Sequence, residues 1–426
     1  MKNMERSSNE KKILIISHLA INKTNNVGKT LAQLFEKFDS SSLSQLFFNP
    51  ILPDIDKCKY WYKITDEQVM HSFLGKRAGE EYFYCNIQAE TKSLLYRKSI
   101  GKTTLKFLMR DVMWSLSRID WKALYSWIDK VCPELIFLAP GYSVFAYDIA
   151  LKISKYKNIP IVCFFMDDYY NENKAKLNPL EILRRKWLRK VIKKTVNHSA
   201  GVIAVSKEMA ADYQKCFHVN VDVLYTPYMY EEISCIDEKV DLQRLEFVYA
   251  GSLGLNRWKI LYELGKLLQQ NNYNALLTIY ASADYEKEIQ KLLQISSIKY
   301  GGFLTEAQLK EKVYCANVVV HIESFDKDKL KRTRYSISTK IPECLASNKI
   351  FLAVGPEEQA SINYLKENEA ALVCTSSHEM ERYVQMICEK KVDYKVYRKN
   401  AWKLLSENHN PNVIYNYLKE LFKRLT

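Results

Sequence analysis

Short apolar runs of strand length alternate along this chain with longer stretches of helical spacing, and the alternation occurs in each half. This pattern is typical of βα units wound around parallel sheets. Because 426 residues are too many for one hydrophobic core, we expect two doubly wound α/β domains that face a central cleft. The expected strands lie at 13–17, 44–48, 135–139, 159–165, 201–206 and 221–225, and then at 245–251, 275–280, 298–302, 316–322, 349–354 and 371–375.

Helices are expected between these strands. A long helix is predicted from about 103 to 130, and a basic one over 179–196. The stretch 226–244 is polar and acidic without a sustained period, so it is the expected linker. We therefore predict an N-terminal domain at 1–235, a C-terminal domain at 236–408 and a final amphipathic helix at 409–426.

The chain is basic, with 63 Lys and Arg against 49 Asp and Glu and a net charge of +14. Such an excess favours an anionic partner: nucleic acid, a nucleotide phosphate or a negatively charged membrane. The ten cysteines stand singly, without the spacing of a zinc site, and indicate a reducing compartment such as the cytoplasm. Neither a signal peptide nor a run of about 18 apolar residues is present. Any membrane contact is therefore expected to be peripheral.

The segment NVGKT follows the first expected strand. It resembles the end of a phosphate-binding loop, but Lys23 stands where that motif needs glycine. We expect Asn26 and Gly28 to lie at the mouth of a helix that runs to Phe38, where free backbone N–H groups could meet a phosphate or a substrate hydroxyl. The alternative is a helix start without a ligand.

The segment MDDYY places Asp167 and Asp168 directly after an apolar strand. Catalytic and substrate-binding groups often lie at this position in α/β folds. The alternative is that one of the two carboxylates caps a helix or begins a turn. No second acidic pair stands nearby, so we predict no metal site.

The predicted helix 179–196 combines apolar residues at helical spacing with Arg184, Arg185, Lys186 and four further basic residues. A basic amphipathic helix suits an anionic membrane surface, at about 1 kcal/mol for each basic side chain near the lipid. The same spacing serves a helix that packs on a core and exposes a solvated face, so both interpretations stay open.

Two segments of the second half suit a phosphorylated ligand. FVYAGSLGLNR is a strand followed by a glycine loop and by Arg257, which opens a helix and suits a diphosphate. YSISTKIPECLASNK offers backbone donors near Ser338 and Thr339, then the cation Lys340 and the carboxylate Glu343, which could accept two sugar hydroxyls. A capped helix without a ligand is the alternative for this second segment.

Together these segments resemble the retaining glycosyltransferases of the GT-B type, group 1 or family 4. The matching pieces, in chain order, are ILIISH with NNVGKT, IPIVCFFMDDYY, GVIAVSKEMAADY, FVYAGSLGLNR, and YSISTKIPECLASNKIFLAVGP followed by YLKENEAALV. They are spread over almost the whole chain. In detail, the chain is similar to bacterial members that build surface polysaccharides.

The resemblance implies that 1–235 binds the acceptor, that 236–408 binds a nucleotide sugar and that the helix 409–426 packs back across the hinge. It implies that Glu343 binds the ribose hydroxyls and that Arg257 and Lys340 stabilise the leaving diphosphate. The remaining donor-side residues implied are Gly251, Ser252, Tyr280, Ala281, Phe303, Ser338 and Thr339. Asn26, Gly28, Asp167 and Asp168 would lie on the acceptor side, with Asp168 as a catalytic candidate.

The chain departs from the family pattern at three places. Tyr335 stands eight residues before Glu343, where the family has its first acid. Gly28 is one glycine where the family usually has a pair. Gly141 and Tyr142 follow the strand 135–139, where a histidine is often found.

The expected activity is transfer of a sugar from a UDP- or GDP-sugar to a saccharide or lipid-linked acceptor, with retention. A cation and helix-terminal N–H groups would stabilise the charge of the leaving group, and no metal or other cofactor is then required. We expect a cytoplasmic protein that contacts anionic membrane through 179–196 and binds no nucleic acid. The alternatives are a GT-B nucleotide-sugar 2-epimerase and a non-enzymatic protein that binds nucleic acid or membrane.

Overall fold

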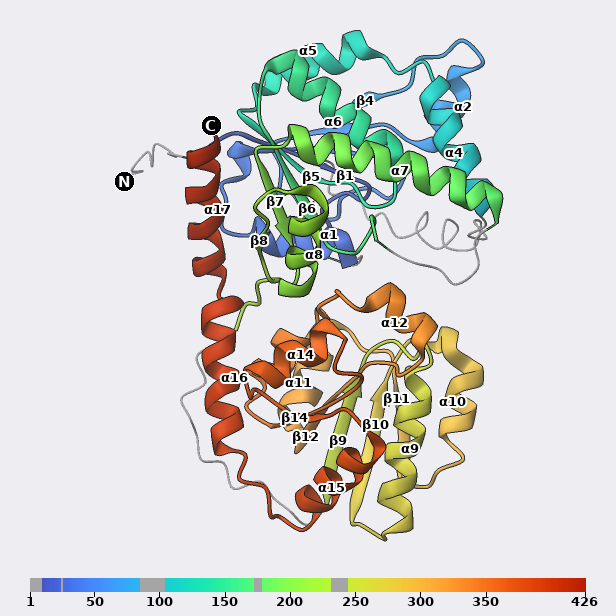
Figure 1. Cartoon of the computed structure of the whole chain (residues 1–426), viewed down its shortest axis with the longest axis vertical. Coiled ribbons are helices and arrows are strands. Elements are labelled where there is room, and N and C mark those ends of the chain that lie inside the picture. The colour runs from blue at the N-terminus through green and yellow to red at the C-terminus, as the bar shows by residue number, and fades with distance from the viewer. Residues whose placement is uncertain (1–9, 24–25, 85–103, 172–177, 231–243) are drawn as a thin grey trace. The chain divides into compact units, whose positions relative to one another are not determined.

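A computed structural model of the chain describes residues 10–23, 26–84, 104–171, 178–230 and 244–426. The chain divides into two compact units (Figure 1). Unit 1 comprises Met1–Leu224 and Pro411–Thr426, and unit 2 comprises Tyr225–Asn410. The predicted boundary between residues 235 and 236, and most of the predicted linker, lie outside the described residues.

Unit 1 is built on an eight-stranded sheet with the order β4-β3-β2-β1-β5-β6-β7-β8. All neighbours in the sheet are parallel except the edge pair β3 and β4. The strands are β1 Ile13–Ser17, β2 Leu43–Phe47, β3 Tyr60–Lys63, β4 Glu80–Tyr82, β5 Leu135–Ala139, β6 Ile161–Phe165, β7 Gly201–Ala204 and β8 Asp222–Val223. The central strands β1, β2, β5 and β6 are fully buried, as expected for a parallel sheet with helices on both faces.

The helices of unit 1 follow its strands in chain order. They are α1 Asn26–Leu34, α2 Asp66–Ser72, α4 Thr104–Leu116, α5 Trp121–Val131, α6 Val144–Lys157, α7 Pro179–His198 and α8 Lys207–Phe217, with a short 3-10 turn at Ser40–Ser42. The last helix of the chain, α17 Pro411–Leu425, also belongs to unit 1. Its aromatic residues Tyr415 and Phe422 pack against Phe38, and Phe422 also meets Phe137. These contacts join the last helix of the chain to the core of unit 1.

Unit 2 is built on a six-stranded parallel sheet with the order β11-β10-β9-β12-β13-β14. The strands are β9 Leu245–Ala250, β10 Ala275–Tyr280, β11 Ile298–Gly302, β12 Val318–Ile322, β13 Ile350–Val354 and β14 Leu372–Cys374. The helices are α9 Arg257–Gln270, α10 Glu286–Leu292, α11 Glu306–Cys315, α12 Lys327–Thr333, α13 Ile341–Ala346, α14 Ala360–Glu367, α15 Ser377–Cys388 and α16 Lys395–Asn408, with a 3-10 turn at Ala283–Tyr285. Apolar side chains from the strands and from α9, α10 and α15 form its core.

All twelve predicted strands are present, and the two Rossmann-like domains of a GT-B fold are confirmed. Two strands were not predicted. β3 and β4 have only four and three residues, and β4 is a partly exposed edge strand. Runs this short carry little periodicity, so sequence pattern alone does not distinguish them from loops.

The predicted helix 103–130 is wrong as a single helix. The chain leaves the helix after Leu116 and begins a second one at Trp121. Asp120 caps the second helix, because its side chain accepts a hydrogen bond from the backbone N–H of Ala123. Backbone bonds between Ala78 and the residues 118 and 120 hold the break in place. In the part of the chain that the structure describes, no helix is both long and apolar enough to cross a membrane.

Candidate functional site

The loops at the carboxyl edge of the second sheet bring the predicted donor-side residues of β9, β10 and β11 side by side. The backbone N–H of Gly251 donates to the carbonyl of Tyr280 (3.0 Å), and that of Ala281 donates to the carbonyl of Gly302 (3.1 Å). β9 and β12 are the neighbours at which the strand order reverses. Ligands of open α/β sheets bind at this switch point, so the geometry agrees with a binding site there.

Arg257 opens α9 at this switch point and forms a partly buried ion pair. Its Nη2 donates to Glu323 Oε2 at 2.8 Å, and Glu323 directly follows β12. His321 Nε2 lies 3.3 Å from the other oxygen of Glu323. Within the described part of the chain, Arg257 Nε is buried without a hydrogen-bond partner. The cation predicted for the diphosphate is therefore held in position by a carboxylate.

The electrostatics of the pair agree with its geometry. Burial alone would raise the pKa of Glu323, but the hydrogen bonds and charges of His321 and Arg257 outweigh burial and lower it. Burial would likewise lower the pKa of Arg257, and the neighbouring Glu323 carboxylate raises it instead. Both groups are thus ionised at neutral pH. A diphosphate bound to Arg257 would therefore contact a guanidinium that is also paired with the Glu323 carboxylate.

The glycine loop before Arg257 has a fixed conformation. Ser252 Oγ accepts a hydrogen bond from the N–H of Gly254 (3.1 Å) and lies 2.6 Å from the hydroxyl of Tyr285. Asn256 precedes the helix in the left-handed region, with a φ of 65°, and its amide donates to Asp326 at 2.8 Å. These bonds fix where α9 begins, and therefore where Arg257 is held.

The segment 333–340 is fastened to the start of α14. Ser361 Oγ donates to the carbonyl of Ser336 (2.9 Å) and accepts from the N–H of Ser338 (3.1 Å). The N–H of Lys340 donates to Ser338 Oγ at 3.3 Å. Two of the backbone donors predicted for phosphates are thus engaged within the protein. Thr339 lies between them and is exposed.

Glu343 and Lys340 are the charged groups of this segment. Glu343 lies in α13 and is 6% exposed, and Lys340 Nζ is 3.5 Å from its Oε2. Burial, and after it the charge of Glu343, raise the pKa of Tyr228. Tyr335, at the position of the absent acid, is buried beneath the guanidinium of Arg334, 4.1 Å from its ring centroid. An aromatic side chain therefore fills the space where the family pattern has a carboxylate.

The aromatic residues expected around the nucleotide base differ in exposure. Tyr280 is buried at the end of β10, and its ring occupies the space that a side chain at position 301 would need. Phe303 follows β11 and is 78% exposed. An aromatic ring of this exposure at the carboxyl edge is free to stack on a planar base.

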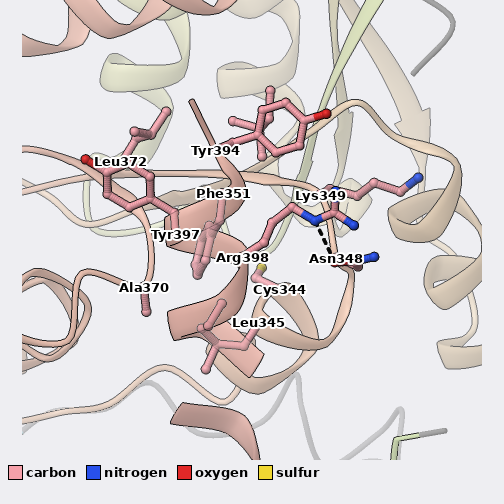
Figure 2. Close-up of a pocket in the computed structure, with 12 residues that line it drawn as sticks. Cys344, Leu345, Asn348, Lys349, Phe351, Ala370, Leu372, Tyr394, Tyr397 and Arg398 are labelled. Carbon is pink, nitrogen blue, oxygen red and sulfur yellow. Dashed lines mark hydrogen bonds between the residues drawn. The ribbon is translucent and has the colours of Figure 1, made fainter. Parts of the chain in front are cut away.

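A small cavity lies behind the helix that carries Glu343. Figure 2 shows its lining from α13, β13 and α16, with Arg398 Nε donating to Asn348 Oδ1 at 2.6 Å. The cavity measures about 10 Å³, room for one water at most. It is a packing void, and its hydrogen bond ties α16 to the end of α13.

Gly28 lies inside the first turn of α1, which begins at Asn26 and ends at Leu34, earlier than the expected Phe38. A Cβ at position 28 would overlap the Asn22 side chain and the carbonyl of Ala20. The glycine is therefore required for packing of the preceding loop against α1. The side chain of Asn26 is outside the described atoms.

Asp167 and Asp168 follow β6, as predicted. Asp168 is 5% exposed, and its Oδ1 accepts from the N–H of Asn171 (2.8 Å) and from the hydroxyl of Tyr213 (3.1 Å). These bonds fit the alternative in which the carboxylate begins a turn. Asp167 is half-buried. A substrate role for either residue stays a prediction.

Several polar residues at the carboxyl edges were missed by the sequence analysis. Glu323 and His321 come at the end of β12, and His18 comes directly after β1. A polar side chain at the end of an apolar strand is a signal that could have found them. Among the described residues, no group of three or more His, Cys, Asp or Glu side chains is placed to hold a metal ion.

The comparisons with known proteins agree with this architecture. The model of Glycosyltransferase Family 4 matches residues 90–228. No curated protein matches the sequence. Anabaena Alr3699/HepE in complex with UDP is 12% identical with a TM-score of 0.63, over 97% of this chain and 100% of that one.

Two further solved structures are similar over the whole chain. The lipopolysaccharide outer core galactosyltransferase WaaB is 12% identical with a TM-score of 0.60, over 97% of this chain and 99% of that one. Sucrose-phosphate synthase from Thermosynechococcus elongatus is 12% identical with a TM-score of 0.63, with the same coverage. At such identities the likeness establishes the fold. Together with the family match over 90–228, it indicates a glycosyltransferase with a GT-B fold.

Proposed function

We propose that the protein transfers a sugar, with retention, from a nucleoside-diphosphate sugar to a saccharide or lipid-linked saccharide of a bacterial surface polysaccharide. The observation that carries the proposal is Arg257, held by Glu323 at the switch point of the second sheet. A guanidinium there suits a diphosphate. UDP is the favoured nucleotide, because Alr3699/HepE was solved with UDP in the same fold. A polysaccharide acceptor is favoured because WaaB, a lipopolysaccharide outer core galactosyltransferase, has a similar fold.

The donor-side residues have separate proposed roles in binding and in catalysis. The buried Glu343 carboxylate would accept hydrogen bonds from the ribose hydroxyls, and the exposed Phe303 ring would stack on the base. Arg257 and Lys340 would stabilise the diphosphate as it leaves, when its negative charge increases. One such interaction is worth about 3 kcal/mol, or a hundredfold in rate. Asp168 remains the proposed acceptor-side carboxylate.

Product analysis tests this function. The purified protein is incubated with UDP- and GDP-sugars, with and without a panel of oligosaccharide acceptors, and the products are separated by mass and linkage. We expect a new glycoside and release of the nucleoside diphosphate only when an acceptor is present. Epimerised sugar formed from the donor alone would instead establish the 2-epimerase alternative. Lys340→Met should lower the rate of transfer about a hundredfold without lowering the melting temperature by more than a few degrees.

We also propose that α7 brings the enzyme to anionic membrane at its cytoplasmic face. Leu180, Ile182 and Leu183 in its first turns are exposed, and Leu183 is 58% exposed. Lys186, Lys190 and Lys193 continue the stripe that Leu183 begins, at spacings of three and four residues, and all three are exposed. An exposed apolar turn beside a row of cations suits a lipid surface.

Other basic residues of α7 support the fold. Arg184 Nε donates to the buried Asp111 of α4 at 2.7 Å, and its Nη2 donates to the carbonyl of Tyr142. Arg189 Nε donates to the carbonyl of Tyr170 at 2.8 Å. Membrane contact would therefore rest on the exposed lysines rather than on these arginines.

A further inference from the structure

A second polar cluster lies at the switch point of the first sheet. The strand order of unit 1 reverses between β1 and β5, and His18 directly follows β1. Asn49 comes just after the neighbouring strand β2, Asp66 begins α2 and Arg110 lies in α4. Ligands of open α/β sheets bind at such a point. None of these four residues has a part in the functions described above.

The guanidinium of Arg110 is held rigidly and its charge is offset. Arg110 Nε lies 2.8 and 3.0 Å from the two oxygens of Asp66, and Trp114 Nε1 donates to the same carboxylate at 2.6 Å. The guanidinium carbon lies 4.9 Å from the centroid of the Phe145 ring, which in turn stacks on Trp114 with centroids 3.7 Å apart. The cluster therefore presents donors in a fixed geometry without a net positive charge.

The hydrogen-bond network fixes the tautomer of His18. Asn49 Oδ1 accepts from the backbone N–H of Ile51 (2.9 Å), so the amide nitrogen of Asn49 faces His18 Nε2 at 3.5 Å. Nε2 then accepts, and a neutral imidazole must carry its proton on Nδ1. Burial, helped by the charge of Arg110, lowers the pKa of His18 to about 3 despite the opposing charge of Asp66. His18 is thus a neutral donor at physiological pH.

Two hydrogen-bond donors of the cluster lack an acceptor within the described residues. His18 Nδ1 and Arg110 Nη2 are buried, and among the residues that the structure describes neither has a hydrogen-bond partner. A buried donor without a partner destabilises the folded protein, so an oxygen from outside the protein is expected there. Because the Arg110 charge is already offset by Asp66 and His18 is neutral, a neutral hydroxyl oxygen fits this site better than a phosphate or a carboxylate.

We propose that His18 and Arg110 bind a hydroxyl oxygen of the saccharide acceptor. The inference rests on the proposed function, since only a transferase needs an acceptor site in unit 1. The acceptor would thus contact the end of β1, the strand next to β5. After β5 itself, Gly141 and Tyr142 stand where the glycosyltransferases that the chain resembles often have a histidine. Ordered water that satisfies the same two donors is the competing occupant.

The test follows the His18 imidazole by nitrogen-15 NMR of the full chain. Methyl glycosides of glucose, galactose, mannose and N-acetylglucosamine serve as probes, added in the presence of UDP. We expect the free protein to show the Nδ1–H tautomer, and at least one glycoside to shift the Nδ1–H signal in a saturable manner. Arg110→Met should weaken that binding about tenfold or more.

Asn49→Asp is the sharpest variant, because it keeps the size of the side chain and the acceptor for Ile51. Its carboxylate can only accept, so it should move the proton of His18 to Nε2 and leave Nδ1 as an acceptor. We expect the tautomer to change and glycoside binding to weaken while the melting temperature at pH 7 changes little. His198→Gln is the matched control, since His198 pairs with Ser154 in the same unit (3.2 Å) and should leave glycoside binding unchanged.

The outcomes separate this inference from the proposed function. If UDP stabilises the protein but no glycoside moves the His18 signal, the site holds only water and the inference is overturned. A shift with inorganic phosphate and none with the glycosides would also overturn it, because the site would then select an anion. If neither UDP nor any glycoside binds, both the inference and the proposed function fail.

Discussion

Single polar residues at the carboxyl edges of the two sheets form the candidate binding sites of this fold. Arg257 was predicted because a glycine loop and a cation at a helix start form a recognisable pattern, and Glu343 because it matches a family motif. Glu323 and His18 were not predicted, since one polar residue after an apolar strand is equally typical of a turn. Arg110 had no signal at all, because it reaches the site from a helix distant in sequence.

The Arg257–Glu323 pair allows binding to be separated from folding. Arg257→Met should leave Glu323 buried without its partner and lower the stability by about 3–5 kcal/mol, and it should also weaken UDP binding at least about tenfold. In the double variant Arg257→Met with Glu323→Gln no charge remains buried, so we expect the melting temperature to recover. Affinity for UDP, measured by calorimetry, should not recover. Recovery of both would mean that Arg257 has only a structural role.

His409 makes stability depend on pH. It is fully buried in unit 2, with Nδ1 2.7 Å from the carbonyl of Thr226 and Nε2 2.9 Å from the hydroxyl of Tyr364. Burial lowers its pKa from 6.5 to about 4, so the folded protein binds fewer protons than the unfolded chain between these values. The stability that neutral His409 contributes is therefore complete above pH 6.5 and is lost as the pH falls toward 4, by about 3 kcal/mol.

The variant His409→Gln should lack this contribution. We expect its stability, measured by urea unfolding between pH 4.5 and 7.5, to change less with pH than that of the wild type. The buried His18 has a lowered pKa with the same sign and acts equally in both proteins, so the difference between the curves isolates His409. Parallel curves would contradict the assignment.

At the scale of elements, α7 shows what periodicity can and cannot predict. The helix was predicted over 179–196 and is found at Pro179–His198. Leu188, Val191 and Ile192 of its apolar stripe are buried, but the residues of its first turns are exposed. Helical spacing identifies one face of a helix without saying how far along the helix its neighbours extend. The break between α4 and α5 was missed because the apolar spacing continues across it and only the cap at Asp120 marks it.

Charge reversal on the exposed stripe of α7 tests the proposed membrane contact. Lys186, Lys190 and Lys193 changed together to Glu should reduce sedimentation with vesicles of anionic phospholipid to the level of neutral vesicles, because each lysine contributes about 1 kcal/mol. Lys287, Lys299 and Lys395 of unit 2 are also exposed and provide a control with the same change in net charge. Equal loss in both triple variants would show that net charge rather than α7 drives binding.

At the scale of the whole molecule, the sequence predicts two α/β domains and every long strand. It does not predict the order of strands within either sheet, because pairing such as β1 with β5 or β9 with β12 joins segments far apart in the chain. Those two pairings create the switch points. They also bring the candidate residues, which are far apart in the sequence, to the same edge of each sheet. Local sequence pattern was therefore sufficient to predict the two domains. Which residues lie together at each site could be seen only in the folded structure.

Nucleotide binding by unit 2 is the central claim, and a thermal-shift screen tests it most directly. The wild type and Glu343→Ala are heated with UDP, GDP, ADP and CMP and with their common sugar adducts. A ligand at 100 times its Kd adds about 2.7 kcal/mol to stability. We predict that UDP and a UDP-sugar raise the melting temperature of the wild type and that the variant, still folded, loses most of that response. If no nucleotide shifts either folded protein, the donor site in unit 2 is contradicted.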